Sequence, residues 1–148
     1  MIHADVFKSV VANAPLISID LVVKNEQGQI LLGLRDNRPA QGFWFVPGGR
    51  IRKDESIKKA FSRLAFIELG INLSIKDAEF IGVYEHFYSD NFSGTDFSTH
   101  YIVMGYCMNL DVDLNTLPHG QHREYRYVTK NELLNCLKVH KYTKNYFL

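Results

Sequence analysis

The stretch GGRIRKDESIKKAFSRLAFIELGI, residues 48–71, decides the fold of this chain. Its first half predicts a glycine bend followed by a loop with basic residues. Its second half predicts an amphipathic helix over 55–69, because apolar residues recur at steps of three and four: Ile57, Ala60, Phe61, Leu64 and Ile67. We expect Asp54 to be the N-cap of this helix and Gly70 to end it.

The segments on either side of this helix predict β-strands. Residues 16–24 and 29–35 are rich in apolar and β-branched side chains and flank a turn sequence, which predicts a β-hairpin. Residues 43–46 predict a third strand that closes at Pro47-Gly48-Gly49 in a glycine bend. Further strands are predicted at 79–88, 98–108 and 124–128. A capping box from Thr129 to Glu132 predicts a second helix at about 130–139.

The order of these elements defines the fold class. Strands, a helix, more strands and a second helix favour an α+β fold, an α/β/α sandwich with a mixed β-sheet between helices. The loop at 89–96 is too polar to be buried, and we expect it to move. No repeat or linker divides the chain, so residues 1–148 are predicted to form a single domain.

Composition excludes several classes of function. The chain has 148 residues, 46% hydrophobic and 22% charged, with a formal net charge of +1, so no global field steers it toward nucleic acid. An anionic partner must therefore be held by a local cluster of charge. Cys107 and Cys136 stand alone, which matches neither a zinc motif nor a redox pair. Met1 to Pro15 has no basic start and no apolar run, so we expect a cytoplasmic protein that binds neither nucleic acid nor a membrane.

The spacing of charged residues and glycines in 48–71 resembles the Nudix box of hydrolases that cleave nucleoside diphosphates linked to another group. The matching positions are Gly49, Glu55, Arg63, Glu68, Gly70 and Ile71. The family pattern has further glutamates where this chain has Leu64 and Ile67. Since residues 64 and 68 lie one helical turn apart, Glu68 is the only carboxylate left on that face. One glutamate suffices for Mg²⁺ when water and phosphate oxygens complete its coordination.

The same departure from the box is similar to one branch of the family, the GDP-mannose mannosyl hydrolases. The likeness extends over PLISID at 15–20, NRPAQGFWFVPGGR at 37–50, HFYSDNFSGTDFSTHY at 86–101 and the pair Gln121-His122. It implies hydrolysis of GDP-mannose, or GDP-glucose, to GDP and the free sugar, by water attack at the anomeric carbon with inversion.

The resemblance also implies a role for individual residues. Mg²⁺, or Mn²⁺ in its place, is expected at the Gly48 carbonyl, Glu68 and Gln121, with His122 as the general base. A neutral imidazole with a pKa near the ordinary value of about 6.5 suits that role. The remaining implied site residues are Arg35, Arg50 and Tyr101, which stabilise the departing diphosphate, Asp20 and His86 near the sugar, and Phe7, which stacks on guanine across the interface of a homodimer.

Ordinary structural roles compete with several of these assignments. Asp20 could be an edge or solvent-facing strand residue, Glu68 a surface glutamate, and His122 a plain loop histidine. Arg63 is better explained by structural pairing near Glu55 than by catalysis. The tyrosines expected to pack in the sheet rather than contact a ligand are Tyr84, Tyr88, Tyr125 and Tyr127.

Two other functions remain open at this stage. A conventional Nudix pyrophosphatase would direct water to phosphorus and split the diphosphate of a nucleoside-diphosphate sugar. A non-catalytic nucleotide-sugar binding domain would bind the nucleotide sugar without hydrolysing it. Isotope-labelled water separates the two reactions, because the label enters the sugar in one case and a phosphate in the other.

Overall fold

A seven-stranded mixed β-sheet forms the centre of the molecule in this computed structural model, which describes residues 2–118 and 122–148. Its main path runs β3 (Trp44–Phe45), β2 (Ile30–Arg35), β1 (Leu16–Lys24), β6 (Thr99–Asn109), β5 (Glu79–Tyr88). Two further strands pair off this path: β4 (Gly48–Arg50) with β1, and β7 (His122–Val128) with β2. Strands β1 and β6 run parallel, whereas the other pairs are antiparallel.

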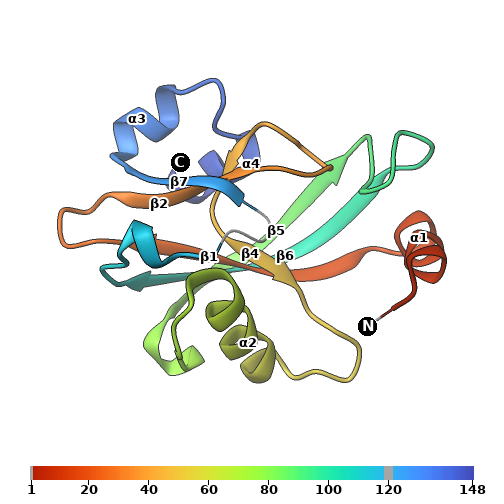
Figure 1. Cartoon of the computed structure of the whole chain (residues 1–148), viewed down its shortest axis with the longest axis horizontal. Helices are drawn as coiled ribbons and strands as arrows, with labels where there is room; N and C mark the ends of the chain where they lie inside the picture. The colour runs from red at the N-terminus through yellow and green to blue at the C-terminus, as the bar shows by residue number, and fades with distance from the viewer. Residues whose placement is uncertain (1, 119–121) are drawn as a thin grey trace.

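Helices cover both faces of this sheet (Figure 1). Helix α2 (Ile57–Leu69) packs on one face, and α3 (Lys130–Asn135), α4 (Lys141–Lys144) and the 3₁₀ turn η3 (Asn145–Phe147) cover the other. Two 3₁₀ turns, η1 (Ile75–Asp77) and η2 (Leu114–Thr116), lie in connections. Side chains of β1 alternate between the two faces of the sheet. Ile19 and Leu21 therefore pack in the core under α2, whereas Val22 packs in the core on the opposite face. The predicted α/β/α sandwich is confirmed.

Helix α2 begins later than the sequence predicted. Ser56, not Asp54, is the N-cap, and its side chain accepts a hydrogen bond from the Lys59 amide at 3.1 Å. Asp54 instead has a positive φ of 64°. The cause is Glu55, whose carboxylate accepts from the Arg52 amide and holds the preceding turn closed. The predicted stop is confirmed, since Gly70 caps the helix in the left-handed conformation at φ 71°.

The glycines at 48 and 49 do not form the predicted bend. They lie in β4, paired with β1, and neither needs a positive φ. Close approach requires a glycine at position 48, where a Cβ would lie 2.4 Å from the Ile19 carbonyl oxygen. A Cβ at position 49 would lie 2.5 Å from Leu64 Cδ2, the movable end of a side chain. The sequence therefore marked these glycines correctly but predicted a bend where they form a strand.

Other differences lie at the chain ends and in one loop. Helix α1 (Ala4–Asn13) was not predicted, and it sits at one end of the molecule near the N-terminus (Figure 1). Helix α3 stops at Asn135 rather than near 139, because the Lys138 carbonyl accepts from the Trp44 amide and draws the chain along β3. The polar loop at 89–96 was expected to stay unburied, but Asn91 is fully buried, bonded within the loop to Ser93 and Asp96.

Within the described residues, no helix has both the length and the apolar character needed to cross a membrane.

Candidate active site

A pocket of 950 Å³ opens where α1, α2, β1 and the end of β2 meet. Every predicted site residue that the structure describes lines it: Phe7, Asp20, Arg35, Gly48, Arg50, Glu68, His86, Tyr101 and His122. The predicted metal ligand Gln121 lies outside the described residues. Residues far apart in the sequence, from Phe7 to His122, are thus brought to one cavity.

Glu68 projects from α2 and is buried, with 4% of its surface exposed, so it is not a surface glutamate. Its neighbours on the helix, Leu64 and Ile67, also line the pocket. Burial raises the pKa of Glu68 to about 7, against the attraction of Arg35, and the nearby Asp20 raises it further. The site therefore holds one helix carboxylate that is costly to ionise without a cation beside it.

Asp20 lies in the interior of the sheet rather than at its edge, since β1 runs between β2 and β6. It pairs with Gly48 of β4. A Cβ at position 48 would lie only 2.5 Å from the Asp20 Oδ1. Its Oδ2 accepts a hydrogen bond of 2.5 Å from the Tyr146 hydroxyl. Burial is the main cause that raises the pKa of Asp20 to about 7, while the Tyr146 bond and Arg35 oppose that rise.

His122 begins β7 and is 2% exposed, so it is not a plain loop histidine. Its Nε2 lies 4.0 Å from the Glu68 Oε2, and its ring fills the space beside Gly33, where a Cβ would fall 2.4 Å from Nδ1. Burial first, and the charge of Arg35 second, lower the pKa of His122 to about 4. The expected value near 6.5 is therefore wrong, although the imidazole is neutral at physiological pH, as a base requires.

Arginine side chains give the pocket its charge. Those that line it are Arg35, Arg38, Arg50, Arg52 and Arg63, against the acids Asp20, Asp36 and Glu68. The Arg35 Nε donates to the Pro39 carbonyl at 3.0 Å, which fixes its direction. Arg63 is bound by Glu55 at 2.6 Å and donates to the Arg50 carbonyl at 2.8 Å, so the predicted structural pairing is confirmed. A surplus of guanidinium groups suits a phosphate-bearing ligand.

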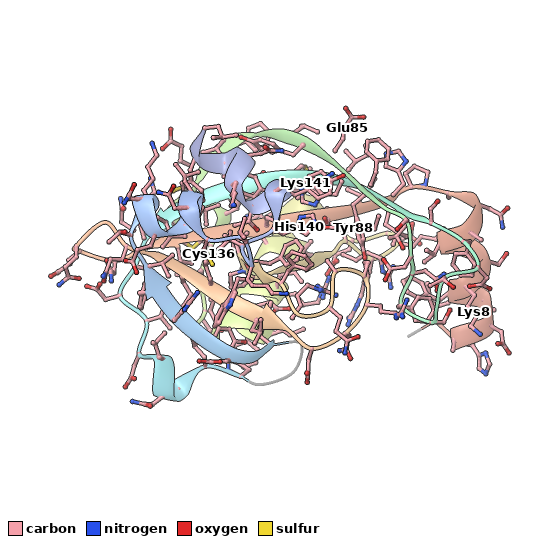
Figure 2. The ribbon with its side chains drawn as sticks, turned by 90° about the horizontal axis from the view of Figure 1, so that it is seen from above. Lys8, Glu85, Tyr88, Cys136, His140 and Lys141 are labelled. Atoms are coloured by element: carbon pink, nitrogen blue, oxygen red, sulfur yellow. The ribbon has the colours of Figure 1, made fainter. Side chains whose placement is uncertain are left out.

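Aromatic side chains also line the pocket. Phe7 of α1 packs on Phe92 at 5.0 Å and against the Arg50 guanidinium at 4.8 Å, so it reaches the pocket of its own chain. Tyr88, predicted to pack in the sheet, also lines the pocket. Figure 2 shows Tyr88 close to His140, and the two rings lie 5.6 Å apart.

Burial also shifts the pKa of two further pocket residues, His86 and Tyr101. The His86 Nε2 is buried with no hydrogen-bond partner among the described residues, and burial, helped by His140, lowers the His86 pKa to about 4. Burial raises the pKa of Tyr101, so its hydroxyl keeps its proton and can donate to an anion. Sequence reasoning missed Tyr146, because nothing local to that position marks it.

The donor set fits a divalent cation that keeps part of its water. No group of three His, Cys, Asp or Glu side chains with metal-binding geometry occurs in residues 2–118 and 122–148. The Glu68 carboxylate and the Gly48 carbonyl are hard oxygen donors at the pocket wall, the kind that Mg²⁺ and Mn²⁺ prefer. The raised pKa of Glu68 supports the fit, because a cation would favour its ionised form.

The fold and the modified box define a Nudix domain, and comparison with known proteins agrees. A family model described as the NUDIX domain matches residues 14–147. The chain belongs to the Nudix hydrolase superfamily. It is 44% identical over 123 residues, 82% of its length and 76% of the relative's, to the low-salt glycan biosynthesis protein Agl8 of Haloferax volcanii.

Solved structures show the same fold at low identity. A MutT protein from Methanosarcina mazei Go1 matches with a TM-score of 0.73 and 24% identity, over 91% of this chain and 92% of that one. The Nudix domain of NrtR from Shewanella oneidensis, crystallised with ADP ribose, matches with a TM-score of 0.68 and 17% identity, over 99% and 96%. These matches establish the architecture alone.

Proposed function

We propose that the protein hydrolyses a GDP-sugar, GDP-mannose with GDP-glucose as second candidate, to GDP and the free sugar in a reaction that depends on Mg²⁺ or Mn²⁺. One observation carries the proposal: Glu68 faces an arginine-rich pocket as the only carboxylate of α2, because Leu64 and Ile67 replace the glutamates of the usual box. The 44% identical relative, a glycan biosynthesis protein by name, supports a sugar-linked substrate.

The loss of the helix carboxylates favours water attack at carbon rather than at phosphorus. Leu64 and Ile67 offer no charge to gather several cations beside the phosphate. The arginines at the pocket can instead hold the diphosphate as it departs, and Tyr101 can donate its hydroxyl proton in a hydrogen bond. A diphosphate needs no protonation to leave, so the reaction requires a base for the water and no carboxylic acid opposite it. Inversion at the anomeric carbon follows.

His122 is the base in this proposal. Its imidazole is neutral at physiological pH, and its Nε2 points toward Glu68 at the wall of the pocket. A divalent cation held by Glu68 and the Gly48 carbonyl would neutralise charge on the diphosphate. Base catalysis of this kind contributes about 10²- to 10⁴-fold, and the low pKa places this imidazole toward the weaker end.

The sugar and the nucleotide base bind to different residues of the pocket in this proposal. The unpartnered Nε2 of His86 and the carboxylate of Asp20 can bind sugar hydroxyls. Phe7 and Phe92 offer aromatic faces for the base, beside the Arg50 guanidinium. Arg35 and Arg50 line the same pocket and can hold the phosphates that join the sugar to the nucleoside.

Product analysis tests the proposal. Incubation of GDP-mannose with the protein and Mg²⁺ should yield GDP and mannose by chromatography, and none without Mg²⁺ in EDTA. The appearance of GMP and mannose 1-phosphate would instead establish the conventional pyrophosphatase. Tight binding of GDP-mannose without release of any product over hours would establish a binding domain. Glu68→Gln serves as the matched inactive control.

A further inference from the structure

We propose that Tyr146, in the last 3₁₀ turn of the chain, is a positioning residue that fixes the carboxylate of Asp20 in the pocket; its catalytic consequence rests on the proposed function. The Tyr146 hydroxyl donates to Asp20 Oδ2 at 2.5 Å across 126 residues of sequence. Tyr146 does not line the pocket among the residues described, so it acts through Asp20 and touches no substrate.

The two carboxylate oxygens of Asp20 have different surroundings, and the hydrogen bond from Tyr146 fixes which oxygen lies in each. Oδ1 packs over Gly48, where only a glycine leaves room for it. Oδ2 turns to the Tyr146 hydroxyl. Without that bond the carboxylate can rotate about its terminal torsion, which is broad for aspartate. The bond therefore selects one orientation of Asp20 against the candidate metal donor Gly48.

Tyr146 is itself held in place by the sheet. Its ring meets Tyr84 edge-on at 4.5 Å. It also lies over Gly105 of β6, where a Cβ would come within 3.1 Å of its Cε1, so the strand leaves space for the ring. Burial raises the pKa of Tyr146, which keeps its hydroxyl protonated and able to donate.

The same C-terminal segment also supports His86, the other side chain proposed to bind the sugar. The Tyr142 ring stacks on His86 at 4.4 Å and 5°. Its hydroxyl accepts from the Phe87 amide and donates to the Phe87 carbonyl, each at 2.8 Å, which anchors the segment to the edge strand β5. Both sugar-facing side chains, Asp20 and His86, thus take their positions from residues 142–146.

A double-mutant cycle tests the inference. Tyr146→Phe should lower kcat for GDP-mannose about 10-fold with KM changed less than about twofold, since only orientation is lost. Asp20→Asn should lower kcat at least as much, and adding Tyr146→Phe to Asp20→Asn should change nothing further. Tyr84→Phe is the matched control and should keep the activity of the natural chain. Multiplicative losses in the double variant would overturn the proposal.

A second measurement does not depend on activity. The short Tyr146–Asp20 bond should give a hydroxyl proton resonance downfield of the amides in the ¹H NMR spectrum, lost in Tyr146→Phe and shifted or lost in Asp20→Asn, and retained in Tyr84→Phe. Its persistence in Tyr146→Phe would overturn the inference. If the natural chain releases no GDP from GDP-mannose, the proposed function fails, while this resonance still decides whether Tyr146 holds Asp20.

Discussion

Replacing Glu68 by Gln should stabilise the metal-free protein while abolishing its metal-dependent activity. Burial raises the pKa of Glu68 from 4.5 to about 7. A group with a raised pKa contributes stability below its unfolded value, and that contribution is lost as the pH rises through the folded value. At pH 8 the carboxylate is ionised and buried, so folding is opposed by at most about 3 kcal/mol at about 1.36 kcal/mol per pH unit. Gln removes the charge and keeps the shape.

Glu55 offers the matched control because its shift has the opposite sign. The Arg63 hydrogen bond, the largest cause, lowers the pKa of Glu55 to about 2. Its contribution to stability is therefore present above pH 4.5 and lost as the pH falls toward 2. Glu55→Gln should destabilise the protein at pH 8, by about 1 kcal/mol once solvent screening near the surface is allowed for.

Urea unfolding at pH 8 in EDTA measures both variants. Glu68→Gln should raise the free energy of unfolding by about 1–3 kcal/mol, and Glu55→Gln should lower it. Saturating Mg²⁺ should then stabilise the natural chain and leave Glu68→Gln unchanged. A Glu68→Gln variant less stable than the natural chain in EDTA would refute the reasoning, since it would mean that the carboxylate is fully compensated without a cation.

Three further predictions follow from the pocket. His122→Gln should lower kcat by about 10²-fold, the weaker end of the range for base catalysis, in a coupled GDP-release assay, with GDP affinity nearly unchanged by calorimetry; unchanged turnover would remove His122 from the mechanism. Phe7→Ala should raise KM at least about 5-fold with little change in kcat. A fall in kcat as large as the rise in KM would argue against a role of Phe7 in binding the nucleotide base. Because burial, helped by His140, lowers the pKa of His86 from 6.5 to about 4, its stability contribution is complete above pH 6.5 and lost as the pH falls through 4. Acid unfolding of His86→Gln should therefore show a weaker loss between these values, by at most about 3 kcal/mol, and an identical pH profile would contradict the burial of a neutral imidazole.

Local periodicity made most of the fold predictable. Helix α2 was predicted from apolar steps over 55–69, and the strands at 16–24 and 79–88 agree with the observed bounds of β1 and β5. The start of helix α2 was predicted wrongly because Glu55 turns its carboxylate to the Arg52 amide and to Arg63, eight residues away. Helix α1 was missed because a ten-residue amphipathic segment is held by its contacts rather than by propensity.

The sequence predicted which residues form the site but not how deeply they are buried or what they contact. Phe7, Asp20 and Glu68 were placed together by resemblance, and the structure brings them to one pocket. The low pKa of His122 follows from its burial, which one residue in a sequence does not reveal. The Tyr146 contact with Asp20 spans 126 residues and leaves no local pattern. The contacts that the sequence did not predict, such as Tyr146 with Asp20, arise from long-range packing of the C-terminal segment.

Hydrolysis of GDP-mannose in H₂¹⁸O tests the account most directly. Attack at the anomeric carbon by water that His122 deprotonates predicts that the label enters mannose and that the released GDP carries none, by mass spectrometry. Label in the β-phosphate of GDP, or in GMP or mannose 1-phosphate, would show attack at phosphorus and contradict the account.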